Sequence, residues 1–561
     1  MHAVKKLDAL TSLRFFAAAM IVVGHGHRLF GSLGIANTLS LAQGVSFFFV
    51  LSGFILAYNY PVLSSWESVA RFLKARFARI WPAHVAAIFL MLFLTGDLNS
   101  SASSLSGAIF AGLMNLLLIQ SAVPFKSIFL SFNGVAWSIS TEMFFYLAFP
   151  LLIGGVMAGW KRKLALLTGV VVMYVWFAVL WKVPVDESLP QLNLMGLLYV
   201  NPLVRVLEFF IGVMTCRAFL HLRSLGVDQK ISVPVFTALE VSVLVLVVAS
   251  MWFTPKIREL FSWWGDLAAV VHFYSSKSGS AGVFALLILV FAWGRGALAR
   301  ALLWWPLVRL GEISFSLYLV HTSVLGWYEN NIEHFSTLPP WSMAFVFWAL
   351  SLCVAWLLHT LVESPFRKII LSPSAVASLD TVKTLFASRQ LVALTGGVVL
   401  LVLMQCGPAS LMMSECEKSS VCVQIIKRSS MAVPVDFNGY ASLVGLRVQP
   451  AENRLQFVEL VFRLQHPIHG YKLAIHVLDK DSVILGQSDS LINIPNVDVG
   501  GLWIERVTLP IAFTSSQAVS LGLAVYKYPS SLLSVTYPAT DYKGHRALLN
   551  FEKLRLKTVS H

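Results

Sequence analysis

Apolar segments of membrane-spanning length recur from Leu10 to about Gln405, and this feature constrains the fold more than any other. A helix needs about 20 predominantly apolar residues to cross the hydrocarbon core of a bilayer. Hydrophobic residues make up 57% of the chain and charged residues only 12%, with a mean hydropathy of +0.73. Because this composition excludes an ordinary soluble protein, the sequence predicts a polytopic α-helical membrane protein.

Ten membrane crossings are expected before residue 370. Their approximate bounds are 10–29, 43–60, 80–96, 136–157, 164–182, 197–216, 233–253, 281–294, 307–328 and 341–361. A further apolar run at about 106–122 has a flank rich in serine and glycine, and it lies where only an odd number of crossings fits. We therefore expect this run to be re-entrant or interfacial. An eleventh crossing is expected at about 391–406.

The positions of lysine and arginine orient these crossings, because cytoplasmic loops carry an excess of both residues. Lys5 and Lys6 place the N-terminus in the cytoplasm. The stretch WESVARFLKARFARIWP, from Trp66 to Pro82, is expected to be a basic cytoplasmic loop between the second and third helices. After eleven crossings, the rest of the chain lies on the far side of the membrane.

The pattern of apolar and polar residues changes after about residue 410. Short alternating segments such as KLAIHVL and VSLGLAVY, with turn signals between them, favour a β-sandwich of immunoglobulin-like type. The expected domains are a membrane domain at 1–370, a linker with an additional transmembrane helix at 371–410, and an extracytoplasmic β-sandwich domain at 411–561. Within the last of these, GQSDS (Gly486 to Ser490) is expected to be a turn, and Trp503 is either a core residue or a ligand-contacting residue.

The cysteine positions leave two alternatives open. Cys416 and Cys422 lie close together at the start of the expected external domain, where they form either a small disulfide loop or two free thiols. No zinc-type cysteine spacing occurs in the sequence, and no metal is expected.

Arg14 and His25 stand at the two ends of the apolar stretch RFFAAAMIVVGH. Eleven steps of about 100° bring His25 back to within about 20° of Arg14 on a helix surface, about 16 Å further along the axis. Ionisable groups inside a membrane are costly and usually line a pathway or a site. The alternatives are that Arg14 extends to the membrane interface and that His25 makes a packing hydrogen bond.

Polar residues in two other apolar segments indicate which type of reaction the protein catalyses. WSISTEMFFYLAFP places Trp137, Ser138 and Glu142 at the outer start of one helix, and GEISFSLYLVH places His321 inside another. A carboxylate and two histidines suit general acid–base catalysis. Core packing is the alternative for His321.

Two further features belong to the second and third helices. Arg76 and Arg79 lie one turn apart if the segment is helical, so both guanidinium groups can hold one anionic ligand. The cytoplasmic excess of arginine explains the same pair without a ligand. Ser52, in the LSGF stretch that is expected to break the second helix, is expected to line a channel.

Six motifs resemble, in order, those of a membrane acyltransferase family called acyltransferase type 3, which O-acylates bacterial surface sugars. The motifs are LDALTSLRFFAAAMIVVGH (Leu7 to His25), FFFVLSGFIL (Phe47 to Leu56), RFARIWP (Arg76 to Pro82), WSISTEMFFYLAFP (Trp137 to Pro150), GEISFSLYLVH (Gly311 to His321) and VESPFRK (Val362 to Lys368). Each motif is weak by itself, but six in the family's order are strong. The family's arginine, ten residues and histidine fall on Arg14 and His25, and its cytoplasmic arginine pair falls on Arg76 and Arg79.

The resemblance implies transfer of an acyl group, usually acetyl, from cytoplasmic acyl-CoA to a hydroxyl of an extracytoplasmic glycan or lipid-linked oligosaccharide. The glycan classes it implies are O-antigen, capsule and exopolysaccharide, at a bacterial inner membrane. Arg76 and Arg79 would anchor the coenzyme and Arg14 would guide its arm. His25 would either accept the proton of the sugar hydroxyl or carry the acyl group covalently.

The same resemblance suggests roles for the remaining polar residues. Glu142 would orient the imidazole or the acceptor, His321 would join it as a catalytic group, and Ser52, Trp137 and Ser138 would contact substrate.

Rival functions from other classes stay open. A lipid or polysaccharide transporter or flippase would also have many helices with polar groups inside the membrane, but it should show internal repeats, and none is found. A metal site built from His25 and His321 lacks a third ligand. The net charge of +14 agrees with membrane lipids and anionic ligands as partners rather than with nucleic acid. No GDS stretch of a hydrolase-like domain follows the last apolar segment.

Overall fold

The computed structural model describes residues 6–30, 38–95, 105–154, 156–185, 192–260, 262–331 and 340–372, together with ten strands between residues 435 and 550. The chain divides into two compact units, Met1–Thr395 and Gly396–His561. The expected crossing at 391–406 and the cysteines Cys406, Cys416 and Cys422 lie outside the described residues.

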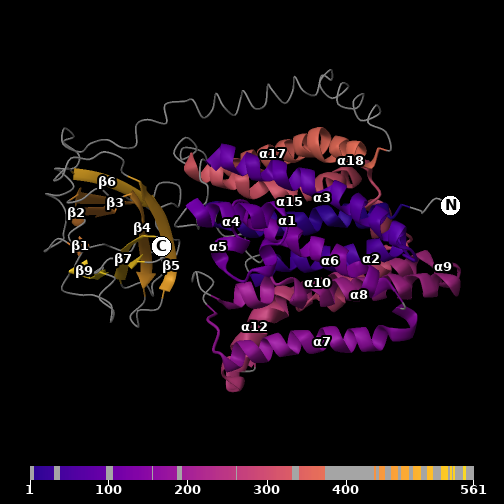
Figure 1. The fold of residues 1–561 in the computed structure, drawn as a ribbon. Helices are drawn as coiled ribbons and strands as arrows, with labels where there is room; N and C mark the ends of the chain where they lie inside the picture. Colours follow the sequence, from indigo (N-terminus) through magenta and orange to yellow (C-terminus); the bar gives the residue numbers. More distant parts are fainter. Residues whose placement is uncertain are drawn as a thin grey trace. The chain divides into compact units, whose positions relative to one another are not determined.

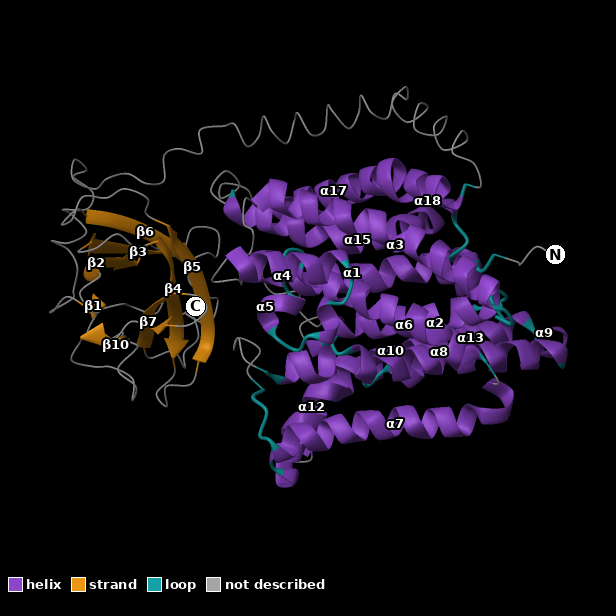
Figure 2. Cartoon of the chain, viewed as in Figure 1, coloured by secondary structure: helices purple, strands orange, loops and turns teal. Residues whose placement is uncertain are grey.

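The first unit is helical (Figures 1 and 2). Its helices are α1 (Asp8–Phe30), α2 (Gly44–Asn59), α3 (Trp66–Thr95), α4 (Leu105–Leu116), α5 (Lys126–Phe129), α6 (Trp137–Ile153), α7 (Val156–Leu180), α8 (Pro202–Ser224), α9 (Val227–Lys230), α10 (Val233–Phe253), α11 (Ile257–Leu260), α12 (Asp266–Ser278), α13 (Ala281–Phe291), α14 (Ala297–Ala301), α15 (Trp305–Asn330), α17 (Pro340–Leu358) and α18 (Ser364–Leu371). A 3-10 turn, η4 (Gly134–Ala136), leads into α6, and a π-helical turn, η8 (His359–Glu363), joins α17 to α18.

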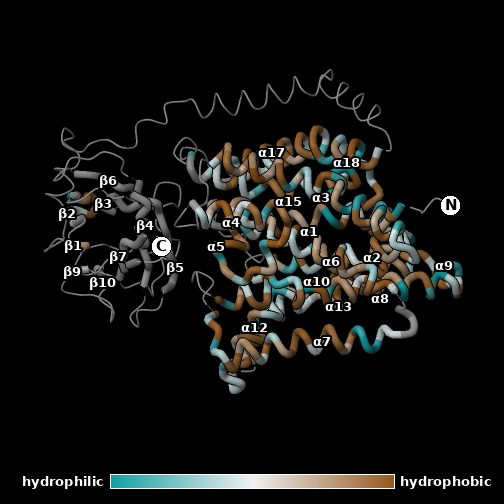
Figure 3. The backbone as a smooth tube through the Cα atoms, viewed as in Figure 1, coloured by the Kyte–Doolittle hydropathy of each residue, from teal (hydrophilic) through white to brown (hydrophobic). Residues whose placement is uncertain are grey.

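Eight helical segments in the described part of the chain are long and apolar enough to cross a membrane. The segment Gly159–Leu180 has a mean hydropathy of 2.1, yet only 17% of it is buried inside the protein. Figure 3 shows α7 hydrophobic along most of its length. Apolar helix faces that point away from the protein core are stable where lipid is the solvent. The chain is therefore a multi-pass membrane protein.

The expected number of ten crossings stays a prediction. α8 and α15 are 23 and 26 residues long, and both lengths exceed the minimum for a span. These two helices pack extensively on other helices of the unit, α8 on α2 and α15 on α1. Both contain charged residues, and neither is among the eight apolar segments.

α4 differs from the long helices. Its 12 residues extend about 18 Å at 1.5 Å per residue, which is less than the hydrocarbon thickness of about 30 Å. After α4, the chain turns at Leu118, whose φ is +57°, and Ser140 of α6 donates to the carbonyl of Leu118 while accepting from the amide of Ser121. This short helix, with its turn held by α6, fits the re-entrant or interfacial segment expected there.

The expected loop conformation from Trp66 to Pro82 is wrong, because the structure has helix there, whereas the cytoplasmic placement of this stretch stays a prediction. α3 begins at Trp66 and continues through Pro82 to Thr95. The stretch before Pro82 contains no glycine and includes three alanines, three arginines, one leucine and one lysine, all strong helix formers. A proline within a helix removes only one backbone hydrogen bond and can be tolerated with a bend. The result places Arg76 and Arg79 one turn apart on a rigid helix.

The expected break of the second helix at LSGF is also wrong. α2 runs without interruption from Gly44 to Asn59, and its glycine is used for close packing. A Cβ atom on Gly53 would lie 1.9 Å from the carbonyl oxygen of Phe209, and one on Gly212 of α8 would lie 1.8 Å from that of Val50. Small residues allow two helix backbones to approach each other, as is common in membrane proteins.

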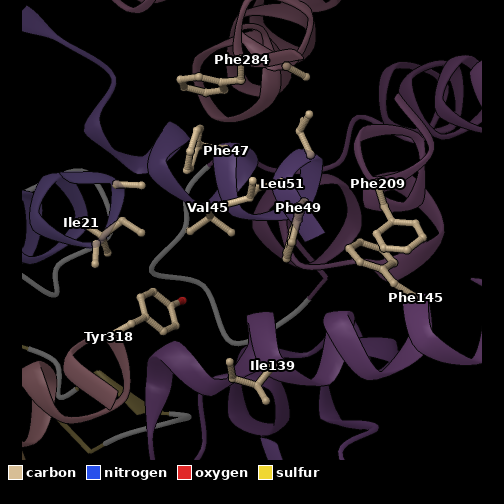
Figure 4. Close-up of a cluster of buried hydrophobic side chains, with 14 of the residues drawn as sticks. Ile21, Val45, Phe47, Phe49, Leu51, Ile139, Phe145, Phe209, Phe284 and Tyr318 are labelled. Carbon is tan, nitrogen blue, oxygen red and sulfur yellow. The ribbon is translucent and has the colours of Figure 1, made fainter. Parts of the chain in front are cut away.

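Aromatic side chains fill the core around α2 (Figure 4). Phe47 points toward Phe284 of α13, with ring centres 5.7 Å apart. On the other side, Phe49 lies 4.9 Å from Phe145 of α6, which in turn lies 4.9 Å from Phe209 of α8. These edge and stacked contacts fix α2 between α6, α8 and α13, so the polar residues of α2 keep a defined position.

The second unit contains two antiparallel sheets in its described residues. The strands are β1 (Val435–Phe437), β2 (Ala441–Val448), β3 (Phe457–Leu464), β4 (His469–Leu478), β5 (Ile484–Asn493), β6 (Leu502–Thr508), β7 (Ser520–Lys527), β8 (Ser531–Leu532), β9 (Val535–Thr536) and β10 (Ala547–Asn550). One sheet has the order β6-β3-β2-β1-β9, and the other has β10-β7-β4-β5 with β8 paired to β7. The immunoglobulin-like topology stays a prediction.

Two sequence segments of this unit can be compared with the strands. GQSDS was expected to be a turn, and this is wrong, because it lies inside β5 with Gly486 opposite Val477 and Ser488 opposite Ile475 of β4. Pairing with the apolar strand β4 outweighs the weak strand preference of these polar residues. Trp503 lies in β6, in register with Phe462 of β3.

Candidate functional site

A cavity of about 630 Å³ lies in the helical unit between α1, α2, α3, α6 and α15. Its size falls within the range of about 300–1,000 Å³ that is typical of small-molecule sites. Lys6, Arg309 and Arg367 line the cavity and are exposed, so the cavity opens to solvent at these three residues. Its charged lining residues are Lys6, Arg14, Arg76, Arg79, Arg309 and Arg367 with Asp8, Glu142, Glu312 and Glu363.

Three of the arginines that line this cavity come from α1 and α3. α1 contributes Arg14, and α3 contributes Arg76 and Arg79. Arg76 is only 7% exposed. Its guanidinium lies over the Tyr60 ring, 5.5 Å from the ring centre, and its Nη2 donates to the Tyr60 hydroxyl oxygen at 3.4 Å. Arginines held in this way present fixed donors that match phosphate or carboxylate groups.

Glu142 shares this cavity with the arginines. Its Oε1 accepts hydrogen bonds from the Ser52 hydroxyl at 3.0 Å and from the Tyr146 hydroxyl at 2.6 Å. The structure thus joins Glu142 to Ser52, two of the residues singled out in the sequence. The hydrogen bonds found for Glu142 go to these two hydroxyls and not to His25.

A second carboxylate lies at the π-helical turn η8. Glu363 is 6% exposed and accepts from the Ser316 hydroxyl and from Nδ1 of His359, both at 2.9 Å. π-helical turns often occur at functional sites, because the extra residue redirects side chains. Glu363 and His359 line the same cavity as the arginines.

Tyr146, His359, Glu363 and Arg367 are among the cavity residues that were not singled out from the sequence. Tyr146, Glu363 and Arg367 lie inside the quoted motifs WSISTEMFFYLAFP and VESPFRK, and His359 lies three residues before the second motif. Each is a polar residue within an apolar segment or at its end, which is a signal of function in a membrane helix. That signal could have identified them, but only the fold shows that they share one cavity.

The inner end of the cavity is more apolar. Phe48, Phe49 and Tyr318 line it, and the ring centres of Phe48 and Tyr318 lie 6.3 Å apart. The hydroxyl of Tyr318 donates to the carbonyl of Val135 at 3.0 Å and accepts from Ser138 at 2.8 Å. The hydroxyl end of the Tyr318 ring is therefore held by two hydrogen bonds beside the cavity.

Trp137 is placed behind this inner end. Its ring packs against Phe49 with centres 6.2 Å apart and against Tyr199 with centres 4.6 Å apart. It is not among the residues that line the cavity, whereas Ser138 is. Of the residues proposed from the sequence to contact substrate, Ser52 and Ser138 thus reach the cavity, and Trp137 supports its wall.

His25 and His321 meet one turn beyond Tyr318. Nδ1 of His25 lies 2.8 Å from Nε2 of His321, although the two residues are 296 positions apart in the chain. Nδ1 of His321 lies 2.7 Å from the carbonyl oxygen of Tyr318. His321 is fully buried and His25 is exposed. The histidine pair is thus connected through Tyr318 to the inner end of the cavity.

This arrangement combines an arginine-lined cavity with a pair of histidines. Arg14 lines the cavity and His25 lies eleven residues further along the same helix. Arginine side chains suit anionic groups, and a neutral imidazole can accept a proton. A long ligand that carries charge at one end and a reactive group at the other matches both features.

Comparisons with known proteins add to this geometry. A family model described as "Acyltransferase domain" matches residues 7–360. The chain is 31% identical over 387 residues to "Acyltransferase MdmB" of Streptomyces mycarofaciens, across 65% of this chain and 93% of that protein. It is 26% identical over 345 residues to "Nodulation protein 10" of Rhizobium leguminosarum bv. viciae, across 56% of this chain and 83% of that protein. No solved structure matches the chain.

Proposed function

The chain belongs to the acyltransferase family whose model spans residues 7–360, and from that membership we propose that it moves an acyl group from cytoplasmic acyl-CoA to a glycan hydroxyl on the far side of the membrane. Acetyl-CoA is the proposed donor. The proposed acceptor is an extracytoplasmic or lipid-linked glycan of a bacterial inner membrane.

One observation carries this proposal, namely the connection between the arginine-rich cavity and the histidine pair. Coenzyme A has several phosphate groups and a long, thin arm that ends in the thioester. Arg14, Arg76 and Arg79 line a cavity of about 630 Å³. At its inner end, the backbone carbonyl of Tyr318 accepts a hydrogen bond from His321. A donor bound by its phosphates at the arginines therefore extends its thioester toward the histidines.

In this proposal, the arginines bind the phosphate groups of coenzyme A and take no part in the transfer step. Guanidinium groups form charge-assisted hydrogen bonds with phosphate oxygens, and Arg76 and Arg79 are positioned by the rigid turn of α3. Glu142, with Ser52 and Tyr146, forms a hydrogen-bonded group on the cavity wall. We assign this group to the passage of the pantetheine arm, whose amides need donors and acceptors inside the membrane.

His25 performs the transfer in this proposal. In direct transfer, its imidazole accepts the proton of the acceptor hydroxyl while that oxygen forms a bond to the thioester carbonyl carbon. The carbon–sulfur bond breaks, and the proton on the imidazole passes to the coenzyme A thiolate. In the covalent alternative, the imidazole nitrogen first bonds to the acyl carbon while the carbon–sulfur bond breaks. The hydroxyl oxygen then takes the acyl group from the nitrogen, and the hydroxyl proton passes to the coenzyme A thiolate. Both routes give one ester and one free thiol.

The proposed orientation follows from the distribution of basic residues. With the N-terminus in the cytoplasm, Arg14, Arg76 and Arg79 lie on the cytoplasmic side, where acyl-CoA is present, and His25 lies nearer the outer side. The β-sheet unit then lies outside the cytoplasm. Its proposed role is to hold the acceptor glycan.

Measuring O-acyl groups on glycans tests the proposed function. Surface and lipid-linked glycans from cells that express the wild-type protein should carry an ester that is lost with His25→Ala, since loss of a general base costs about 100- to 10,000-fold in rate. His221→Ala is the matched control, because His221 is an exposed histidine at the end of α8 and does not line the cavity. Membrane levels of all three proteins are matched by immunoblot, and NMR identifies the modified hydroxyl.

The opposite result has a clear meaning. If the glycans of wild-type and His25→Ala cells carry the same ester groups, the protein does not acylate glycans through His25. Transport of a lipid or polysaccharide then becomes the function to test.

A further inference from the structure

The hydrogen bonds around His321 determine where its protons lie. Nδ1 of His321 faces two backbone carbonyl oxygens, that of Tyr318 at 2.7 Å and that of Leu317 at 3.3 Å. A carbonyl oxygen only accepts hydrogen bonds. Nδ1 of His321 must therefore carry a hydrogen, because two acceptors would otherwise face each other.

The other nitrogen of His321 then carries a lone pair. A neutral imidazole has one N–H group and one acceptor nitrogen. His321 is fully buried, and the groups found at its ring nitrogens are the two carbonyls and the imidazole of His25. No carboxylate is among them, so a positive charge on this ring would be costly inside the protein. Nε2 of a neutral His321 accepts a hydrogen bond.

This acceptor fixes the tautomer of His25. Nδ1 of His25 lies 2.8 Å from Nε2 of His321, so it must supply the hydrogen. The two ring planes differ by only 10°, and the ring centres are 5.1 Å apart. Because the two nitrogens are much closer than the ring centres, the rings meet edge to edge, as a hydrogen bond in the ring planes requires. The lone pair of the His25 ring is consequently on Nε2.

We propose that His321 is a positioning residue that holds His25 in the tautomer with hydrogen on Nδ1, and that Nε2 of His25 is the reactive nitrogen. The proposal rests on the proposed acyl transfer and adds which nitrogen performs it and what orients that nitrogen. The chain of hydrogen bonds ends at the backbone carbonyl of Tyr318, and the side chain of Tyr318 lines the arginine-rich cavity. One turn of α15 therefore sets both the cavity wall and the tautomer of His25.

The transfer step then has defined proton positions. Nε2 of His25 takes the proton of the acceptor hydroxyl, the hydroxyl oxygen bonds to the acyl carbon, and the carbon–sulfur bond breaks. The proton on Nε2 passes to the departing thiolate. Throughout this step, the hydrogen on Nδ1 stays directed at His321, whose acceptor nitrogen stabilises the positive charge that His25 gains. A histidine oriented by a second group is a common catalytic arrangement.

A purely structural role for His321 makes a different prediction. His321 joins α15 to α1 through His25, so a structural role concerns packing between these helices. Any side chain that restores the packing would then restore activity. A role in setting the tautomer needs an acceptor at this position, or a His25 ring whose tautomer is fixed in another way.

The test removes His321 and then fixes the tautomer of His25 with a methyl group on its own ring. His321→Ala should lower kcat by about 100-fold or more, in the range of general-base catalysis, with little change in KM for the donor, because His321 does not line the cavity. In this variant, His25 is replaced by Nδ1-methylhistidine, whose lone pair can only be on Nε2 and whose methyl group occupies the space left by the imidazole. We expect kcat to recover by about 10-fold or more, because an imidazole held in the wrong tautomer loses up to about 10,000-fold in kcat. Nε2-methylhistidine in the same variant is the matched control and should give no recovery.

A second pair of variants covers the case in which His321→Ala does not accumulate in the membrane. His321→Gln provides an amide oxygen that can accept from Nδ1 of His25, whereas His321→Leu is similar in size and provides no acceptor. The Gln variant should retain at least 10-fold more kcat than the Leu variant, a difference of about 1.4 kcal/mol in activation free energy.

Each result has a stated consequence. Equal kcat values for the Gln and Leu variants, or equal activity of the two methylhistidines, would overturn the assignment of His321 as the tautomer-setting residue. If wild-type protein forms no ester in the same assay, the proposed acyl transfer fails instead. The two proposals therefore fail by distinguishable results.

Discussion

At the residue scale, burial distinguishes arginines that are alike in the sequence. Arg71, Arg76 and Arg79 all lie in the basic first half of α3, but Arg71 is exposed and does not line the cavity. Arg76 is buried and Arg79 is half-buried, and an arginine removed from water is costly unless it binds an anion or another partner. We infer that the two cavity arginines serve the donor and that Arg71 serves the orientation of the protein in the membrane.

Substitution of these arginines tests whether the cavity arginines bind the donor and Arg71 does not. Arg79→Gln should raise KM for acyl-CoA by about 10- to 150-fold, since a hydrogen bond to a charged group contributes about 1.5–3 kcal/mol. Its kcat should change much less, because Arg79 binds donor and does not touch the reacting atoms. Arg71→Gln is the control and should leave KM unchanged. Initial rates in membrane vesicles at increasing acyl-CoA concentration give both constants, and equal KM values for the two variants would contradict the assignment.

Sequence patterns singled out many residues that line the cavity or form the histidine pair, but not their partners. Arg14 and His25 were placed on one helix face by their spacing alone, and the arginine pair by its turn. The hydrogen bond between His25 and His321 spans 296 residues, and no local pattern reports such a pair. Glu142 shows the same limit, because its bonds to Ser52 and Tyr146 depend on how α2 and α6 pack.

At the element scale, the contact between α2 and α8 holds the cavity wall in place. Ser52, which faces Glu142, is adjacent to Gly53, which faces α8. Neighbouring residues on a helix point to different sides, so α2 presents polar groups to the cavity and glycine to its neighbour. The position of Ser52 therefore depends on the close approach at Gly53.

A methyl group at Gly53 should weaken this contact. Gly53→Ala places Cβ 1.9 Å from a backbone oxygen of α8, so the two helices must separate, and overpacking of this kind costs about 1–3 kcal/mol. Gly169→Ala in α7 is the control, because nothing lies within 4 Å of its Cβ position and alanine favours helix by up to about 1 kcal/mol. Thermal unfolding in detergent, followed by size-exclusion chromatography, should show a lower midpoint for Gly53→Ala only. A midpoint equal to wild type would mean that the contact is not needed for stability.

At the scale of the whole molecule, the basic residues predict which loops face the cytoplasm. The loop after α7 contains Val185, and the segment after α8 contains Lys230; both residues are exposed. If the N-terminus is cytoplasmic, Val185 lies outside and Lys230 lies inside. This orientation brings the arginine-rich cavity to the side of the membrane where acyl-CoA is made.

Single cysteines at these two positions test the orientation. In a protein whose five cysteines are replaced by serine or alanine, Val185→Cys should react with a membrane-impermeant maleimide added to spheroplasts. Lys230→Cys should react only after the membrane is permeabilised. Reversed labelling would place the cavity outside the cytoplasm and would contradict acyl-CoA as its ligand.

The sequence by itself determined the class of the protein, the approximate positions of its helices and the residues of its motifs. Hydropathy, charge distribution and motif spacing are local properties, so they can be read along the chain. Only the tertiary structure decided that Trp66–Thr95 is one helix, that Gly53 packs against α8 and that His25 meets His321 beside the turn of Tyr318. These features depend on contacts between residues far apart in the chain, because burial and hydrogen-bond geometry are set by packing and not by neighbours in the sequence.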